Sequence, residues 1–372
     1  MAVRQSSLEG VELMADIEFY RGKRVFVTGH TGFKGTWLSK ILLDAGAIVT
    51  GYALDPPTDP SLFAVSKIGR QMQSVTGDIR DLPLLMKTVE EARPEIVFHL
   101  AAQPIVRESY VNPVSTYGTN VMGTVHILEC VRKTGCVKSF LNITTDKVYR
   151  NREWEWGYRE TDELDGYDPY SNSKSCSELV THSYRQSFLE EAGIPVSTAR
   201  AGNVIGGGDF APDRILPDCI RAAKEKEPIL VRNPRSTRPY QHVLEPLSAY
   251  LLIAQRQYGD PGLAGCYNVG PEEGDCITTG QLADIFCRSW GEGQTWINQS
   301  QDGPHEANFL KLDCSRIKRE LGWKPVWHVQ EAVEKTVAWA KAHLAGEDAA
   351  AVMEQQIKEY WKKQVKESCL NR

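Results

Sequence analysis

Arg24-Val-Phe-Val-Thr-Gly-His-Thr-Gly-Phe-Lys-Gly-Thr36 is the stretch that decides the fold. Strand-like residues lead into Gly29, Gly32 and Gly35, and the apolar residues that follow recur at helical spacing. A strand, a glycine-rich turn and a helix form the context that dinucleotide binding requires. Gly29 lets the chain reverse, Gly32 lets backbone amides approach a pyrophosphate, and Gly35 lets the helix pack close to the strand. A tight turn without a ligand is the alternative, which three glycines in this context disfavour.

The composition is that of an ordinary globular protein. The 372 residues include 41% hydrophobic and 24% charged residues, enough for a large core and one or two domains. A net charge of −5 disfavours nucleic acid and anionic membranes as partners, and no apolar run is long enough to predict a membrane span. The nine cysteines lack Cys-x-x-Cys spacing, and residues 1–20 lack the apolar core of a signal peptide. We therefore expect reduced thiols in the cytoplasm and no metal site.

Strand-like segments continue after the glycine turn, with helical patterns between them. The strands are expected at 47–54, 73–80, 95–102, 137–144 and 194–200, and the longest helices at 113–135 and 168–192. This alternation predicts an α/β fold, a Rossmann-type doubly wound parallel sheet whose ligands bind at the carboxyl ends of the strands. The expected domains are an extension (1–21), a dinucleotide-binding domain (22–205, with 237–262 returning to it), a smaller C-terminal substrate-binding domain (206–345) and a helical tail (346–372).

Asp55 indicates which dinucleotide the turn binds. It ends the second predicted strand, 20 residues after Gly35, where a carboxylate can accept hydrogen bonds from the adenosine ribose. No Arg or Lys adjoins Asp55 to hold a 2′-phosphate, so we expect NAD rather than NADP, although Lys34 in the turn complicates this choice. A turn residue at a strand end is the alternative for Asp55. The other residues expected at the cofactor lie in the turn or follow later strands: Thr31, Phe33, Asp78, Ile79, Leu100, Ala101, Ala102 and Gln103.

Two polar motifs follow the fifth predicted strand: Thr145-Asp146-Lys147 and Tyr170-x-x-x-Lys174. Tyr170 and Lys174 are four residues apart and project from the same face of a helix. An ammonium group stabilises a phenolate, which can accept a proton from a sugar hydroxyl while hydride leaves the carbon. Among fourteen tyrosines, one such pair is about what chance supplies. The functional interpretation of the motif therefore depends on its position, shortly after Thr145 at the carboxyl edge of the sheet.

The combination of the glycine turn, Leu100-Ala-Ala102, Thr145 and the Tyr170-x-x-x-Lys174 motif resembles the extended short-chain dehydrogenase/reductase family, over about residues 23–344. The resemblance implies that Thr145 orients a sugar hydroxyl and that Tyr170 is the base for its proton. It implies that Lys174 holds the nicotinamide ribose and lowers the pKa of Tyr170. A homodimer or homotetramer, paired through the helices near 113–133 and 169–192, is implied as well.

The residues after Thr145 point to one part of this family. Nucleotide-sugar 4,6-dehydratases usually carry Asp-Glu there, and this chain has Asp146-Lys147. With His30, Lys34 and the segments 238–242 and 304–307, this departure resembles the branch that acts on CDP-glucose. The branch implies a lyase of deoxysugar biosynthesis, as for O-antigen or lipopolysaccharide. It oxidises C4 with NAD, eliminates water across C5 and C6, and returns hydride to C6, giving CDP-4-dehydro-6-deoxyglucose. Asp146 is the candidate acid and Lys147 the candidate base; a solvated turn pair is the alternative.

The second half of the chain carries the candidate substrate contacts. Arg232, Arg235 and Arg238 occur in one loop with few acids nearby, which suits a diphosphate. A solvated basic loop is the alternative. His305 either reads the nucleotide base or fixes a loop. The residues expected at the substrate are Asn203, Arg214, Arg235, Arg238 and His305. Other functions left open are a dTDP- or UDP-sugar dehydratase or epimerase and a catalytically silent nucleotide-sugar-binding protein.

Overall fold

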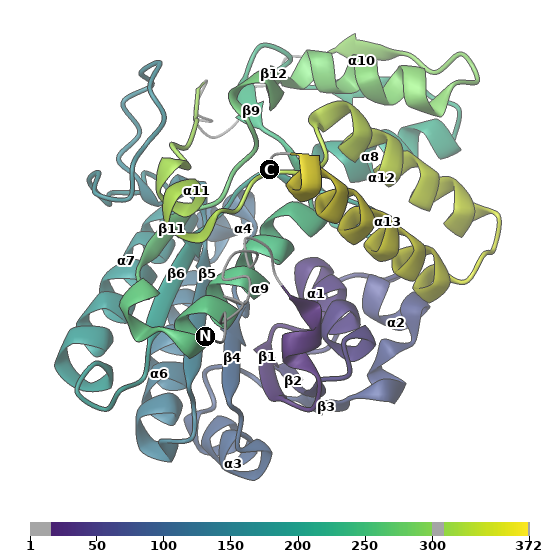
Figure 1. Cartoon of the computed structure of the whole chain (residues 1–372). Helices are drawn as coiled ribbons and strands as arrows, with labels where there is room; N and C mark the ends of the chain where they lie inside the picture. Colours follow the sequence, from purple (N-terminus) through teal and green to yellow (C-terminus); the bar gives the residue numbers. More distant parts are fainter. Residues whose placement is uncertain (1–15, 300–308, 371–372) are drawn as a thin grey trace, which may run out of the picture.

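A computed structural model describes residues 16–299 and 309–370 of the chain. Within these residues, seven parallel strands form one central sheet, in the order β11-β6-β5-β4-β1-β2-β3 (Figure 1). The predicted α/β doubly wound sheet is confirmed. The strands are β1 (Arg24–Thr28), β2 (Ile48–Ala53), β3 (Gln73–Thr76), β4 (Ile96–His99), β5 (Ser139–Thr144), β6 (Val196–Arg200) and β11 (Cys266–Asn268).

The strand order reverses at β1, which pairs with β2 on one side and with β4 on the other. In the β1–β4 ladder Thr28 lies opposite His99, so the glycine turn after β1 and the segment after β4 emerge side by side. The crevice at such a reversal is where open α/β sheets bind their ligands. The fold therefore brings the glycine turn to the expected ligand edge of the sheet.

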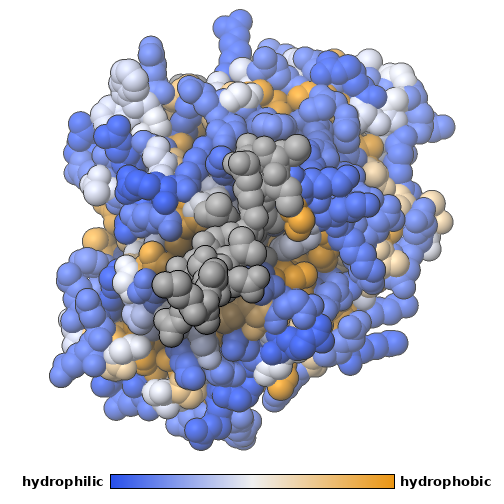
Figure 2. All heavy atoms as spheres, viewed as in Figure 1, coloured by the Kyte–Doolittle hydropathy of each residue, from blue (hydrophilic) through white to orange (hydrophobic). Residues whose placement is uncertain are grey.

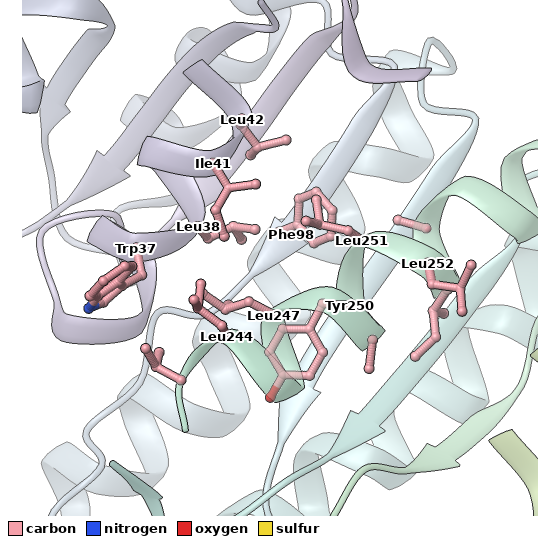
Figure 3. Close-up of a cluster of buried hydrophobic side chains, with 14 of the residues drawn as sticks. Trp37, Leu38, Ile41, Leu42, Phe98, Leu244, Leu247, Tyr250, Leu251 and Leu252 are labelled. Atoms are coloured by element: carbon pink, nitrogen blue, oxygen red, sulfur yellow. The ribbon is translucent and has the colours of Figure 1, made fainter. Parts of the chain in front are cut away.

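Helices cover both faces of the sheet. The helices α3 (Leu82–Ala92), α6 (Gly123–Thr134) and α7 (Pro169–Tyr184) pack beside one another on one face, and α1 (Phe33–Asp44) and α9 (Leu244–Gly259) pack on the other. Figure 3 shows the apolar cluster between α1 and α9, in which Leu38, Ile41, Leu247 and Leu251 are fully or almost fully buried. Full burial of such a side chain stabilises the fold by about 1.5–3 kcal/mol. Strands covered on both faces need apolar residues at nearly every position, which explains the continuous apolar runs in the sequence.

The long helix expected at 113–135 is interrupted. It consists of α5 (Pro113–Tyr117), a π-helical turn η3 (Gly118–Met122) and α6. Asn120 lies in the π turn and is buried, and its side chain bonds Gln103 and Ser173 on two other segments. π turns inside α-helices are often found at functional sites. A second π turn, η5 (Arg185–Leu189), extends α7 in the same way.

A smaller unit with its own apolar core follows the sheet. The helices α8, α10 and α12 form this core with strand β8. Thr278 and Gln281 form a capping box that fixes the start of α10. The elements of this part are β7 (Val204–Ile205), α8 (Ile215–Lys224), β8 (Ile229–Val231), β9 (Thr237–Pro239), β10 (Gln241–His242), β12 (Cys276–Thr278), α10 (Thr279–Trp290), β13 (Trp296–Asn298) and α12 (Val329–Leu344). Three short helices belong with the sheet: α2 (Leu62–Ser66), α4 (Val106–Val111) and α11 (Ser315–Leu321), which packs against β11 and α9.

The chain ends with helix α13 (Ala349–Leu370), which packs against α12, α1 and α2. Met353, Ile357 and Tyr360 bury its apolar side, and the Tyr360 hydroxyl donates to Glu245 Oε2 at 2.8 Å. Figure 2 shows that hydrophilic residues cover most of the face on which α12 and α13 lie. In the described residues, no helix is long and apolar enough to cross a membrane. The helical pattern predicted for the tail thus corresponds to helix α13, which packs against the smaller unit through α12 and against the sheet part through α1 and α2.

Candidate active site

The glycine turn has no room for a side chain at Gly29 or Gly35. Gly29 has a φ of +76°, and a Cβ there would lie 2.8 Å from the Ala101 backbone nitrogen. A Cβ on Gly35 would lie 2.1 Å from the Gly29 carbonyl oxygen. Among the described residues, no side chain caps the start of α1, whose N-cap residue is Gly32. The first backbone amides of α1 therefore stay available for an anion, which a helix N-terminus favours.

Three other turn residues connect to different parts of the molecule. The Thr31 hydroxyl donates to the Leu54 carbonyl at 2.9 Å and ties the turn to the end of β2. The Phe33 ring lies against Gly206, beyond β7. Burial, together with the nearby charges of Arg214 and Lys174, lowers the pKa of Lys34 to about 7. Lys34 therefore interacts electrostatically with Lys174 and Arg214, which its position in the turn does not indicate.

Asp55 and Asp78 follow the neighbouring strands β2 and β3, where the sequence predicts contacts with the adenosine part of the cofactor. Asp55 is exposed just after β2. The Asp78 carboxylate follows the neighbouring strand β3 and accepts hydrogen bonds from the backbone and the guanidinium of Arg80, the shortest at 2.6 Å. These bonds lower the pKa of Asp78. Ile79 is buried, and its carbonyl contacts His126 Nδ1 at 3.0 Å.

The segment after β4 is held from both sides. The backbone amides of Leu100 and Ala101 both donate to the Thr28 hydroxyl at 3.1 Å. The Gln103 amide donates to Asn120 Oδ1 at 2.8 Å, and Asn120 Nδ2 donates to Ser173 on α7 at 2.8 Å. Residues 100–103, among them Ala102, are therefore fixed between the glycine turn and the helix that carries Tyr170 and Lys174.

Tyr170 and Lys174 lie in the first turns of α7, which Asp168 caps by accepting from the Ser171 amide. Lys174 Nζ donates to the Ile143 carbonyl at 3.1 Å, so α7 is pinned to β5 beside Thr145. Burial lowers the pKa of Lys174 to about 8, while Glu178 acts in the opposite direction.

The pKa of Tyr170 differs from the sequence-based expectation. The family resemblance implies that Lys174 lowers it, but burial raises it to about 12, and a hydrogen bond with Thr145 opposes part of this rise. Burial wins because the phenol is only 9% exposed and a phenolate loses its hydration there. Within the protein itself, Thr145 is thus the hydrogen-bonding partner that favours the phenolate form.

Asp146 is the most enclosed of the candidate catalytic groups. It starts a 3₁₀ turn, η4 (Asp146–Val148), and its side chain is fully buried. Its Oδ1 accepts from Thr145 Oγ1 and from Lys147 Nζ, both at 2.9 Å, and its Oδ2 accepts from Asn203 Nδ2 at 3.0 Å. The Lys147 side chain is 30% exposed. An acid and a base that contact each other, next to Tyr170, can move protons at adjacent carbons of one substrate.

The candidate diphosphate residues do not form the acid-poor cluster expected from the sequence. Arg232 pairs with Asp213 at 2.9 Å and with Asp218 at 3.5 Å, so the expectation of few nearby acids is wrong for this residue. Arg214 pairs with Asp209 at 2.9 Å. Arg235 is exposed, and Arg238 in β9 donates to the Thr237 carbonyl. Asn203 contacts Asp146, as described above. His305 lies outside the described residues.

One buried ion pair beside the site was missed. Glu178 lies one helical turn after Lys174 and accepts from Arg200 at 2.9 Å and from Thr198 and Thr144. Arg200 also donates to the Tyr149 hydroxyl at 2.8 Å. The spacing of four residues from Lys174 was the available signal, because it places Glu178 on the same helix face.

The parallel sheet, the glycine turn at its reversal point and the Tyr170–Lys174 pair together define an extended short-chain dehydrogenase/reductase. More specifically, residues 26–336 match the family model described as GDP-mannose 4,6 dehydratase, so the chain belongs to this family.

Individual relatives agree with this placement. The chain is 50% identical, over 353 residues, to CDP-glucose 4,6-dehydratase of Salmonella typhimurium, covering 93% of this chain and 98% of the relative. It is 28% identical to dTDP-glucose 4,6-dehydratase of Streptomyces antibioticus, covering 86% of this chain and 93% of that relative. Among solved structures, dTDP-glucose 4,6-dehydratase from Bacillus anthracis in complex with NAD has a TM-score of 0.72 at 21% identity, covering 88% of this chain and 99% of the other. UDP-glucose 4-epimerase of Thermotoga maritima has a TM-score of 0.74 at 22% identity, covering 86% of this chain and 99% of the other. At these identities the structures establish the shared fold.

Proposed function

We propose that this protein is an NAD-dependent lyase that dehydrates CDP-glucose to CDP-4-dehydro-6-deoxyglucose. The observation that carries the proposal is the 50% identity, over nearly the whole length of both chains, to a CDP-glucose 4,6-dehydratase. The site is equipped for this chemistry, because an acid–base pair, Asp146 and Lys147, adjoins the Tyr170–Lys174 pair.

The residues around the glycine turn fit NAD. The uncapped start of α1 and the cradle that leaves no room for a Cβ at Gly29 and Gly35 suit the pyrophosphate. Asp55 would accept from the adenosine ribose, and Lys174 would hold the nicotinamide ribose. Bound NAD would supply the hydride acceptor for C4 and the hydride donor for C6. The remaining cofactor contacts that we propose are Thr31, Gly32, Phe33, Lys34, Asp78, Ile79, Leu100, Ala101, Ala102 and Gln103.

The proposed reaction divides among four side chains. Tyr170 takes the proton of the C4 hydroxyl, and Thr145 orients that hydroxyl and hydrogen-bonds Tyr170. Once C4 is a ketone, the C5 proton is acidic and Lys147 removes it. The electrons of the C5–H bond form the C5–C6 double bond, the C6–O bond breaks, and Asp146 protonates the departing hydroxyl to give water. Lys147 later returns a proton to C5.

For the diphosphate, we propose Arg214, Arg235 and Arg238 as contacts. A guanidinium can bind phosphate oxygens in a bidentate manner. Arg214 lies close enough to Tyr170 to influence its pKa, so it can link the diphosphate to the reacting sugar. His305 is our candidate for a contact with the cytosine base.

The direct test is incubation of the purified protein with CDP-glucose, dTDP-glucose and UDP-glucose in separate reactions. A keto-sugar from CDP-glucose alone is the expected result. Product from dTDP-glucose or UDP-glucose instead would reassign the base specificity, and no keto-sugar from any of the three would overturn the proposal.

The role of Lys147 has its own test. In Lys147→Ala, substrate should still reduce the bound nicotinamide in a single turnover, but exchange of the C5 proton with solvent deuterium should stop. Lys362→Ala, at an exposed position of α13, is the control variant and should behave as the wild type. Unchanged C5 exchange in Lys147→Ala would remove Lys147 from the role of base.

We also propose that the protein forms a homodimer, which can pair further into a tetramer. Large apolar side chains are exposed on α4, α5, η3 and on α7 with its extension η5, and α5 and η3 pack beside α7. These residues are Val111, Val114, Met122, Leu179 and Phe188. Exposed apolar groups on adjacent helices are typical of a subunit interface. Light scattering should give a dimer or tetramer that Val114→Glu dissociates.

We place the reaction in the cytoplasm. Eight of the nine cysteines, from Cys130 to Cys314, are free thiols, which suits a reducing compartment.

A further inference from the structure

Three consecutive glycines, Gly206–Gly208, follow β7 and begin the segment that ends at Arg214. All three are buried. A Cβ on the middle glycine would lie 2.0 Å from Trp339 Cγ on α12, and one on the last would lie 2.4 Å from Leu62 Cδ1 on α2. The run is therefore packed closely between the smaller unit, which contributes α12, and the sheet part, which contributes α2.

Helix α1 holds the same run through Trp37, whose side chain is fully buried. Its Nε1 donates to the Gly207 carbonyl at 3.0 Å, and in Figure 3 this nitrogen points away from the labelled leucine side chains. The Trp37 ring also meets the ring of His242 edge to face, at 6.1 Å between centroids. His242 in β10 pairs with Ile205, the last residue of β7. The helix that begins at the glycine turn thus contacts both the run and the strand pair that leads into it.

The position of Arg214 follows from that of the glycine run. Asp209 comes directly after the run, is 7% exposed, and pairs with the Arg214 guanidinium at 2.9 Å. Its Oδ1 accepts from the Ala211 amide at 3.2 Å, which fixes the carboxylate within the segment. Arg214 interacts electrostatically with Lys34 on α1 and with Tyr170. A shift of the run would therefore move Arg214 relative to both α1 and the catalytic residues.

We propose that Trp37 is a positioning residue for substrate binding, because its indole N–H holds Gly206–Gly208 against α1 and so sets where Arg214 meets the diphosphate. This inference rests on the proposed function, in which Arg214 contacts the diphosphate of CDP-glucose. Glycine is the residue with the greatest conformational freedom, so the order of three glycines has to come from their neighbours. A segment that is already ordered binds its ligand without the entropic cost of becoming ordered.

The test variant is Trp37→Phe, which keeps an aromatic ring and removes the N–H. Without its donor the Gly207 carbonyl turns toward water, and the substrate has to restore the position of the segment. We expect KM for CDP-glucose to rise about 5- to 50-fold, with kcat within about twofold of the wild type. Calorimetry of the NAD-loaded protein with CDP, which cannot react, should show the same loss of affinity, while the Kd for NAD stays unchanged.

Trp323→Phe is the matched control. Trp323 is also buried, and its Nε1 donates to Ser248 Oγ at 2.9 Å, so the control loses the same kind of hydrogen bond elsewhere in the molecule. Both variants should lower the free energy of unfolding, but Trp323→Phe should keep the wild-type KM and the wild-type Kd for CDP. An equal rise in KM in both variants would overturn the inference. So would a fall in kcat at unchanged KM in Trp37→Phe, or a Kd for NAD that rises as much as that for CDP.

Gly207→Ala is the second variant, and it keeps the inference testable if Trp37→Phe does not fold. Its Cβ displaces the run from the side of Trp339 and leaves Trp37 unchanged. It should raise KM in the same way, and the double variant should be little worse than either single one, because both act through the position of one segment. Fully additive effects, or a wild-type KM in Gly207→Ala, would overturn the inference. Absence of keto-sugar from the wild type itself would instead refute the proposed function, so the two failures are distinguishable.

Discussion

Replacement of Glu178 by glutamine tests how the buried ion pair supports the site. Glu178 and Arg200 are each about 2% exposed, and their charged atoms are 2.9 Å apart. Glutamine keeps the size of the side chain but leaves the guanidinium without its buried countercharge. Removal of one partner of a buried pair typically costs 3–5 kcal/mol, so we expect the free energy of unfolding to fall by about 4 kcal/mol. That is a large part of the 5–15 kcal/mol that stabilises a typical protein.

The same substitution should change the pH dependence of activity. Burial lowers the pKa of Lys174 to about 8, and Glu178 is the group that raises it. Without the Glu178 charge, the pKa of Lys174 falls further, so Lys174 loses its proton at a lower pH. In the proposed mechanism the charged ammonium is the form that acts with Tyr170, so the alkaline limb of the kcat profile should move to lower pH in Glu178→Gln.

Denaturant unfolding and a pH–rate profile are the assays, with Glu163→Gln as the matched control. Glu163 forms ion pairs with Arg150 and Arg152 at 3.3 Å, but all three side chains are at least half exposed. Pairs of this kind contribute little, so the control should unfold like the wild type and keep its pH profile. If Glu178→Gln also matched the wild type in both assays, the ion pair would have no role in stability or in tuning Lys174.

Three further outcomes are expected. Gly35→Ala should abolish NAD binding in calorimetry, because its Cβ would lie 2.1 Å from the Gly29 carbonyl oxygen. Gly274→Ala is the control and should bind NAD normally, because a Cβ on Gly274 would have no atom within 4 Å. Burial lowers the pKa of His99 to about 3, so protonation of His99 opposes folding. Its contribution to the free energy of unfolding is fully present above the unfolded pKa near 6.5 and falls as the pH drops, by about 2 kcal/mol at pH 5. His99→Gln should reduce this pH dependence of the free energy of unfolding in urea titrations. Tyr360→Phe should lower the free energy of unfolding by about 1–3 kcal/mol, because Glu245 loses a buried hydrogen bond; an unchanged urea midpoint would contradict this.

Local pattern was enough to predict most of the sheet. Strands β1 to β6 and the helices after β1, β4 and β5 could be predicted from residues adjacent in sequence. Strand β11 lies within the segment expected to form the substrate-binding domain, and its pairing with β6 could not be predicted from local pattern. The π turn at Asn120 was not predicted, and the hydrogen bonds that hold Asn120 go to Gln103 and to Ser173, which is 53 residues away. Helical periodicity carries no information on such contacts.

The candidate site was predictable in its residues more than in its contacts. Thr145, Tyr170 and Lys174 stand in motifs whose spacing brings them together. The Arg232 pairings with Asp213 and Asp218 depend on how a loop and a helix meet, so a count of acids along the loop misled the prediction. Glu178 could have been predicted to lie near the site, since it follows Lys174 by four residues on the same helix.

The two residues after Thr145 show how one short turn can supply two different proton carriers. Asp146 is enclosed, with a donor on each oxygen, while Lys147 keeps 30% of its side chain exposed and contacts the same carboxylate. A proton donor to a departing hydroxyl needs a fixed direction, which the hydrogen bonds to the Asp146 carboxylate provide. A base that exchanges the C5 proton with solvent needs access to water, which a partly exposed lysine has and a buried carboxylate lacks. In the proposed mechanism, therefore, the buried first residue of η4 is the acid and the partly exposed second residue is the base.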